Sequence, residues 1–263
     1  MTGLPGVSFV TLYSPALRRR ADITLFIPPG NENRPLPLLI LMHGVYGSHW
    51  NWTVLGNVPA TAMEMIREGS IGPFAIAMPS DGLWGDGSGY VVHRELDAES
   101  WIVDDVPGGV RAVCPELQAD RIFLAGQSMG GFGALRLGAK YAARIGGISA
   151  HSPVTRLADL MQHVQQPLKE YLAAGKRDTD ILTGCGGIER NCHRSASTVA
   201  LRMRCSTAIA PSTKRWSKIG SLTHTRSIRA ATTGCIGSSM CAPHCDLSHA
   251  WRMVRLRLVI RAA

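Results

Sequence analysis

The residues best suited to chemistry are Gly-Gln-Ser-Met-Gly-Gly at positions 126–131. They stand between an apolar run with β-branched and aromatic residues at 121–125 and a helix-forming stretch at 132–139. A serine among glycines, between a strand and a helix, is typical of a nucleophile elbow, whose sharp turn exposes the Oγ at the edge of a sheet. The pattern predicts that Ser128 is the nucleophile of an acyl-transfer reaction.

A second glycine-rich loop, His-Gly-Val-Tyr-Gly-Ser at 43–48, follows the apolar run at 36–42. Its two glycines would let the backbone turn so that amide N–H groups point to one place. With the N–H of Met129, the N–H of Val45 or Tyr46 would hold the oxyanion of a tetrahedral intermediate. An ordinary glycine-rich βα loop is the alternative, and the position upstream of the elbow favours the oxyanion hole.

The segment at 79–90 contains Trp84 and Asp86 among four glycines and follows another apolar run. Glycine and aspartate supply turn conformations, and the flat rings of Trp84 and Tyr90 suit the wall of a substrate pocket. His49, Trp50 and Trp52 would form the opposite wall. The alternative for every one of these aromatic side chains is packing in the core, and for Trp50 and Trp52 that alternative is the stronger one.

The rest of residues 1–182 would position these loops, because strand and helix patterns alternate along it. Short apolar runs of this kind suit strands buried on both faces. Repeated strand–helix units predict an α/β fold with a mostly parallel sheet, helices on both faces, and reactive groups at the carboxyl ends of the strands. The expected strands are 7–13 and 23–27, as an antiparallel pair, then 36–42, 73–79, 121–125 and 145–150; the expected helices are 61–67, 100–113 and 132–139.

The chain of 263 residues changes character after residue 182. Residues 1–182 contain 15 Lys and Arg against 17 Asp and Glu, whereas residues 183–263 contain 13 against 2 and six of the seven cysteines. Segment 183–263 also lacks an apolar period. We therefore expect residues 1–182 to form the enzyme core, and 183–263 to be a poorly ordered basic tail rich in Cys, Ser and Arg that leaves the sheet incomplete at its C-terminal side.

The composition of the tail raises two binding functions, and neither is favoured. Zinc sites commonly pair cysteines as Cys-x-x-Cys, which the tail lacks, so no metal or other cofactor is expected. Nucleic-acid binding is disfavoured because the basic residues are dispersed and no known module accompanies them. The candidate zinc ligands are Cys185, Cys192, His193, Cys205, Cys235, Cys241, His244 and Cys245.

We expect neither a membrane span nor a secretory signal. No apolar run approaches the roughly 18 residues of a membrane span, and residues 1–14 lack the basic and apolar regions of a secretory signal. We expect a cytoplasmic protein that does not bind membranes, with reduced thiols. The oligomeric state is left open.

Taken together, segments 43–50, 78–90, 101–107, 126–131 and 151–152 resemble the Putative esterase family of α/β-hydrolases. This family groups esterase D (S-formylglutathione hydrolase) with carbohydrate esterases and mycolyltransferases. The resemblance covers essentially all of residues 1–182.

The resemblance implies an α/β-hydrolase fold and a Ser…Asp…His triad in that chain order. It makes Ser128 the nucleophile and the amides of Val45 and Met129 the oxyanion hole. The expected activity is hydrolysis of a small-molecule ester or thioester through an acyl-enzyme, without a cofactor. An acyltransferase of the same family and a non-enzymatic basic binding protein are the alternatives.

The triad's histidine and aspartate have no recognisable counterpart after residue 182. Asp246 and His249 lie three residues apart, which we interpret as chance spacing. Read from the last base of the Arg229 codon, however, the codons allowed for 229–234 permit Gly-Gly-His-Asp-Trp, which resembles the family's histidine motif. In the same phase, 197–203 permit Phe-Asp-Cys-Gly-Thr-Ser-Asp, which resembles the strand that carries the triad aspartate.

Agreement of several motifs in one phase and in order leads to the hypothesis that the reading frame slipped near Leu182. The aspartate codon would overlap Arg202 and Met203, and the histidine codon would overlap Ala231 and Thr232. A chain without its base and the carboxylate that orients it would be severely impaired, because serine is a weak nucleophile without a proton acceptor.

Overall fold

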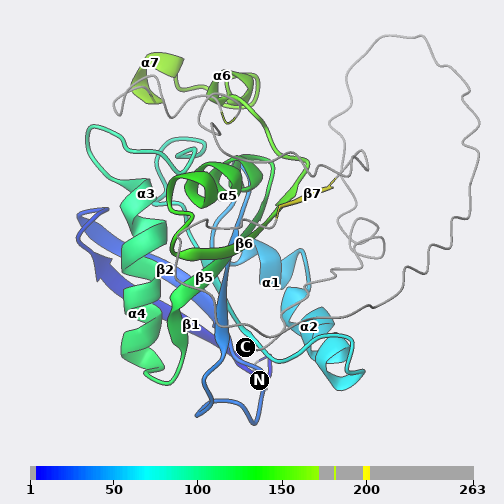
Figure 1. The fold of residues 1–263 in the computed structure, drawn as a ribbon. Coiled ribbons are helices and arrows are strands. Elements are labelled where there is room, and N and C mark those ends of the chain that lie inside the picture. Colours follow the sequence, from blue (N-terminus) through cyan, green and yellow to red (C-terminus); the bar gives the residue numbers. More distant parts are fainter. Residues whose placement is uncertain (1–3, 172–180, 182–197, 202–263) are drawn as a thin grey trace, which may run out of the picture. The chain divides into compact units, whose positions relative to one another are not determined.

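The computed structural model describes residues 4–171, 181 and 198–201, with no side-chain description for 118–121 and 198–201. Within this part of the chain, seven strands form one sheet in the order β1-β2-β4-β3-β5-β6-β7 (Figure 1). Strands β4, β3, β5 and β6 are parallel, and β1, β2 and β7 pair antiparallel with their neighbours. The strands are β1 Val7–Ser14, β2 Arg19–Phe26, β3 Pro37–Met42, β4 Ala75–Pro79, β5 Gln118–Gln127, β6 Ile145–His151 and β7 Thr198–Leu201.

Helices cover both faces of this sheet, with α4 and α5 on one face and α1 and α2 on the other (Figure 1). This arrangement confirms the predicted α/β class and the predicted antiparallel pair at the N-terminus. The helices are α1 Asn51–Val54, α2 Val58–Arg67, α3 Ala98–Ser100, the π-helix η1 Trp101–Asp105, α4 Val106–Val113, α5 Met129–Lys140, α6 Leu157–Leu160 and α7 Leu168–Tyr171.

Alternating side chains of β3 lie in two hydrophobic cores, one on each face of the sheet. Leu38 and Ile40 belong to the core beneath α4 and α5, and Leu39 and Leu41 to the core beneath α1 and α2. Because both faces are covered, the strand needs apolar residues at every position, which explains its continuous apolar run. Each such fully buried side chain contributes about 1.5–3 kcal/mol to folding.

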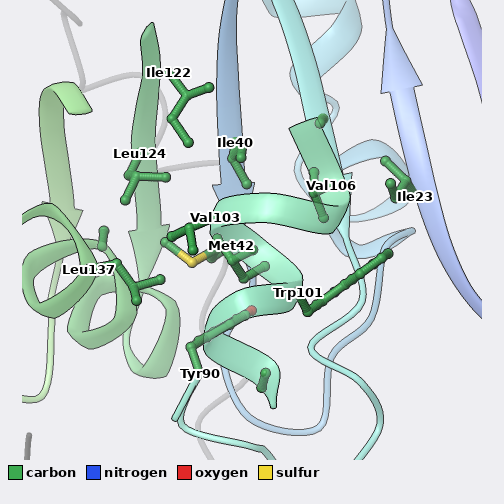
Figure 2. Packing of buried hydrophobic residues seen from close by; sticks show 14 of the residues in the cluster. Ile23, Ile40, Met42, Tyr90, Trp101, Val103, Val106, Ile122, Leu124 and Leu137 are labelled. Carbon is green, nitrogen blue, oxygen red and sulfur yellow. The ribbon is translucent and has the colours of Figure 1, made fainter. Parts of the chain in front are cut away.

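The larger core joins the helical segment before β5 to the central strands (Figure 2). Trp101 is fully buried, and its indole N–H donates to the Ser80 carbonyl at 2.7 Å, which ties η1 to the end of β4. The remaining labelled side chains of this core come from neighbouring elements and face one another across it: Ile23, Ile40, Met42, Tyr90, Val103, Val106, Ile122, Leu124 and Leu137.

The helix expected at 100–113 instead begins at Ala98 and contains a π-helical turn. In that turn the Val106 N–H donates to the Trp101 carbonyl, five residues back. Pro107, which has no N–H, leaves the Val103 carbonyl without a helical donor. The Arg144 guanidinium donates to that carbonyl instead. The proline is therefore accommodated inside a continuous helical segment.

A buried ion pair links α5 to α3. The Arg136 Nη1 lies 2.6 Å from Glu99 Oε2, and the Lys140 Nζ lies 2.7 Å from Glu99 Oε1. Burial raises the pKa of Glu99, but Arg136, Lys140 and Tyr141 outweigh it and hold the pKa below its usual value. Glu99 is therefore ionised at neutral pH and anchors α5 against α3.

The sequence pattern does not predict α1, α6, α7 or β7. Each has four residues, which is too short to display a helical or strand period. The expectation that the sheet would not continue after residue 182 is wrong in one respect, since β7 pairs antiparallel with β6. Backbone pairing of this kind does not require an apolar pattern. Apart from β7, the predicted tail lies outside the described residues. Among those residues, no helix combines the length and apolarity of a membrane span.

Candidate active site

Ser128 occupies a strained turn between β5 and α5. Its backbone has φ 55° and ψ −117°, a conformation that costs a non-glycine residue about 1–3 kcal/mol. Two hydrogen bonds hold the turn: the Ser128 N–H donates to the His151 carbonyl at 2.9 Å, and the Phe132 N–H donates to the Ser128 carbonyl at 3.0 Å. Ser128 thus stands at the N-terminus of α5, where the helix dipole favours negative charge.

Two glycines make this turn possible by allowing backbones to approach closely. A Cβ added at Gly126 would lie 2.4 Å from the Gly130 backbone. A Cβ added at Gly130 would lie 2.3 Å from the Met42 carbonyl oxygen and 2.6 Å from that of His43. The first turn of α5 is therefore pressed against the ends of β5 and β3, as expected of a nucleophile elbow.

The loop at 43–48 lies beside the serine. A Cβ added at Gly44 would lie 3.6 Å from Ser128 Cβ. The Tyr46 N–H donates to the Asp86 carbonyl at 2.8 Å, so it is already engaged, whereas the Val45 N–H has no acceptor among the described residues. Met129 is the first residue of α5, where an N–H has no intrahelical acceptor. Of the two loop amides, Val45 is the better candidate for an oxyanion donor.

The glycines of this loop act differently from the prediction. The residue with a left-handed backbone is Tyr46, at φ 61°, and not Gly44 or Gly47. Gly47 is required for close approach, because a Cβ there would lie 2.7 Å from His43 Nδ1 and 2.8 Å from Asn51 Nδ2. The missing side chain makes room for the imidazole.

The segment at 79–90 packs against both proposed oxyanion residues. Its Gly89 N–H lies 3.3 Å from Met129 Sδ. A Cβ added at Gly87 would lie 2.5 Å from that sulfur and 3.3 Å from Val45 Cγ1. The Asp81 carboxylate shapes this segment by accepting from the Leu83 N–H at 3.0 Å and, through its other oxygen, from the Ser88 N–H at 2.6 Å.

Four of the predicted pocket residues lie in different settings. Trp84 stacks on His93 with ring centroids 3.9 Å apart and meets Tyr171 edge-on at 5.0 Å, so its ring is held by packing. Asp86 joins loops: its carboxylate accepts from the Gln165 N–H at 2.7 Å and its carbonyl accepts from Tyr46. Trp52 is buried in the core beneath α1 and α2, whereas Trp50 is 40% exposed.

His93 gives this region a pH-dependent stability. Burial lowers its pKa below the ordinary 6.5, so the folded protein takes up the proton less readily than the unfolded chain. The free energy of unfolding should therefore decrease as the pH falls through that ordinary value. We expect His93→Gln, which keeps a donor for the Ser88 carbonyl, to give a shallower decrease in urea unfolding between about pH 7 and pH 5. Burial also lowers the pKa of His49 and His151. An unchanged slope in the variant would therefore contradict the role of His93 and assign the pH dependence to those two residues.

A base for Ser128 is not found in the described part of the chain. There, no side chain forms a hydrogen bond with the Ser128 Oγ. His151, whose backbone supports the turn, places its Nε2 3.2 Å from the Ser149 Oγ instead. The predicted positions for the triad aspartate and histidine codons, 202–203 and 231–232, lie outside the described residues, as do the tail cysteines and histidines. No three potential metal ligands come together in the part that is described.

Sequence reasoning did not identify His43 and Asp81 as buried polar residues behind the site, and it expected the Tyr90 ring in the pocket wall. His43 and Asp81 are 2% exposed, and Tyr90 is fully buried with its hydroxyl donating to the His43 carbonyl at 3.1 Å. Burial, and then the nearby Asp81, raise the pKa of Tyr90, so this hydroxyl keeps its proton. The sequence feature that could have indicated these residues is their position within the motifs at 43–48 and 79–90.

The order of the strands is that of an α/β-hydrolase fold, and the strained serine lies at the carboxyl end of its strand β5. The chain belongs to the Putative esterase family, whose sequence profile matches residues 14–227. The match extends beyond residue 182, where the predicted resemblance ended.

Individual relatives agree with this assignment. The acetyl esterase of Caldicellulosiruptor saccharolyticus is 26% identical over 155 residues, which are 54% of each protein. The chain therefore spans about half the length of this curated relative. The S-formylglutathione hydrolase from Agrobacterium tumefaciens superposes with a TM-score of 0.55 at 16% identity, over 70% of this chain and 72% of that one. The S-formylglutathione hydrolase FrmB from Staphylococcus aureus gives 0.53 at 18% identity, over 68% and 71%. At these identities the two structures establish the fold.

Proposed function

We propose that this chain is a serine esterase that hydrolyses a small carboxylic ester or thioester through an acyl-enzyme on Ser128. The observation that carries the proposal is the strained Ser128 backbone at the start of α5, beside a loop with an unengaged amide at Val45. Acyl transfer requires this kind of arrangement, a hydroxyl with backbone donors nearby, and Ser128 is half-buried. Membership in an esterase family points to the same chemistry.

The reaction follows from the roles of these groups. The Ser128 Oγ attacks the carbonyl carbon, and the C=O electron pair moves to the oxygen, where the N–H groups of Val45 and Met129 stabilise the charge. Collapse of this intermediate breaks the bond to the alcohol or thiol and leaves Ser128 acylated. Water then attacks the acyl carbon and releases the acid. The Oγ proton needs an acceptor, and we propose that its usual acceptor was lost with the reading frame after residue 182.

The direct test is covalent labelling of the chain as it stands. We expect p-nitrophenyl acetate to acetylate Ser128 slowly, with one acetyl group detected by peptide mass spectrometry, and Ser128→Ala to abolish this label. Ser152→Ala is a matched control, because Ser152 also has a left-handed backbone at the end of a strand. Acetylation that is absent, or that persists in the Ser128→Ala chain, would refute the nucleophile assignment.

The same acyl-enzyme would serve an acyltransferase, so product analysis has to separate the two activities. An esterase should still release mainly the free acid when an acceptor alcohol is present, because water remains its acyl acceptor. Predominant transfer of the acyl group to that alcohol would favour the acyltransferase alternative.

A further inference from the structure

We propose that His43 is a positioning residue: its imidazole holds the Gly44 carbonyl so that the Val45 N–H points at the oxyanion. The proposal rests on the proposed function, because it assigns a purpose to an amide that only acyl transfer would use. His43 touches neither the substrate nor Ser128 in this account, and it acts through the peptide bond between Gly44 and Val45.

The hydrogen bond of the imidazole defines its protonation. His43 Nδ1 lies 2.7 Å from the Gly44 carbonyl oxygen. A carbonyl oxygen only accepts, so Nδ1 must carry the proton. The Gly47 N–H donates to the same oxygen at 3.3 Å. Two donors therefore fix the direction of this carbonyl.

The geometry of the peptide bond transmits that direction to Val45. The peptide is trans, so the Gly44 C=O and the Val45 N–H point in opposite directions. Donors on the carbonyl side therefore keep the N–H aimed away from His43. Polarisation of the carbonyl also strengthens the N–H as a donor, because hydrogen bonds in a chain are cooperative. The Gly44 backbone adjoins Ser128, which is where an oxyanion would form.

The surroundings hold His43 in place on several sides. The imidazole fills the space that a side chain at residue 47 would occupy. The Tyr90 hydroxyl donates to the His43 carbonyl, and Gly130 is pressed against that same carbonyl. Behind the ring, Nε2 lies 3.9 Å from Asp81 Oδ1 and has no hydrogen-bond partner among the described residues. Nδ1 is thus the only ring nitrogen with a described hydrogen bond.

Two substitutions separate the Nδ1 donor from the bulk of the ring. His43→Asn keeps a donor near the Nδ1 position, whereas His43→Gln places one near Nε2. We expect the rate constant for acetylation of Ser128 by p-nitrophenyl acetate to stay near the parent value in His43→Asn. In His43→Gln it should fall about 10-fold to 10²-fold, with little change in the substrate concentration for half-saturation. Equal rates in the two variants, or a loss confined to substrate binding, would overturn the proposal.

The protonation of His43 can also be tested by NMR on the parent chain, without a variant and without an activity assay. Long-range ¹H–¹⁵N spectra of the histidine rings should show a proton on Nδ1 of His43. A neutral ring protonated on Nε2 would overturn the proposal even if Ser128 is acetylated. A parent chain that shows the Nδ1 proton but no acetylation of Ser128 would instead refute the proposed function, and the assigned purpose of the hydrogen bond with it.

Discussion

A chain read in the shifted frame after Leu182 is expected to hydrolyse p-nitrophenyl acetate about 10⁴-fold faster than the present chain, or more. One nucleotide inserted at the boundary between the Leu182 and Thr183 codons produces this frame. The gain follows from restoring a histidine to take the Ser128 proton and an aspartate to orient that histidine. The present chain would keep only the oxyanion donors and the nucleophile, which supply a small part of the catalysis.

Two controls make this experiment decisive. Inserting two nucleotides at the same boundary gives the third reading frame, which should leave the rate low. Ser128→Ala in the frame-restored chain should remove the gain. A restored chain no faster than the two-nucleotide control would refute the frame hypothesis, and so would codons for 229–234 that do not spell Gly-Gly-His-Asp-Trp in the shifted phase.

The parts of the fold that depend on local pattern were predictable from the sequence. Buried strands such as β3 and β4 require apolar residues on both faces, and the close packing at Gly126 and Gly130 requires glycine, so both leave a visible trace. The expected helix at 100–113 was correct in kind, although a π-turn absorbs Pro107 in a way that spacing does not reveal.

The parts that depend on distant contacts were not predictable. His43 and Asp81 come together only because β3 and β4 are neighbours in the sheet, and neither residue has a periodic pattern that marks it as buried. The sequence predicted that Trp84 forms a pocket wall. Its ring contacts His93 and Tyr171, which come from two other segments, so the sequence around Trp84 does not indicate this packing. Short helices such as α6 are stabilised by tertiary packing and carry little propensity of their own.

Gly130→Ala is expected to cost the protein about 3 kcal/mol of stability and to lower Ser128 acetylation about 10²-fold or more. The new Cβ would lie 2.3 Å from the Met42 carbonyl oxygen and 2.6 Å from that of His43. Both are backbone atoms, so neither can turn aside as a flexible side chain would. The first turn of α5 must move instead, which carries Ser128 and the Met129 N–H away from the loop at 43–48.

Gly108→Ala is the matched control for this substitution. Gly108 lies in α4, and no heavy atom lies within 4 Å of an added Cβ. Because alanine favours a helix over glycine by about 0.5–1 kcal/mol, this variant should be slightly stabilised and acetylated at the parent rate. Urea unfolding measures the stability, and mass spectrometry of the acetylated peptide measures the rate. If Gly130→Ala is as stable and as reactive as Gly108→Ala, the elbow does not depend on the contact between α5 and the end of β3, and the strained backbone at Ser128 needs another cause.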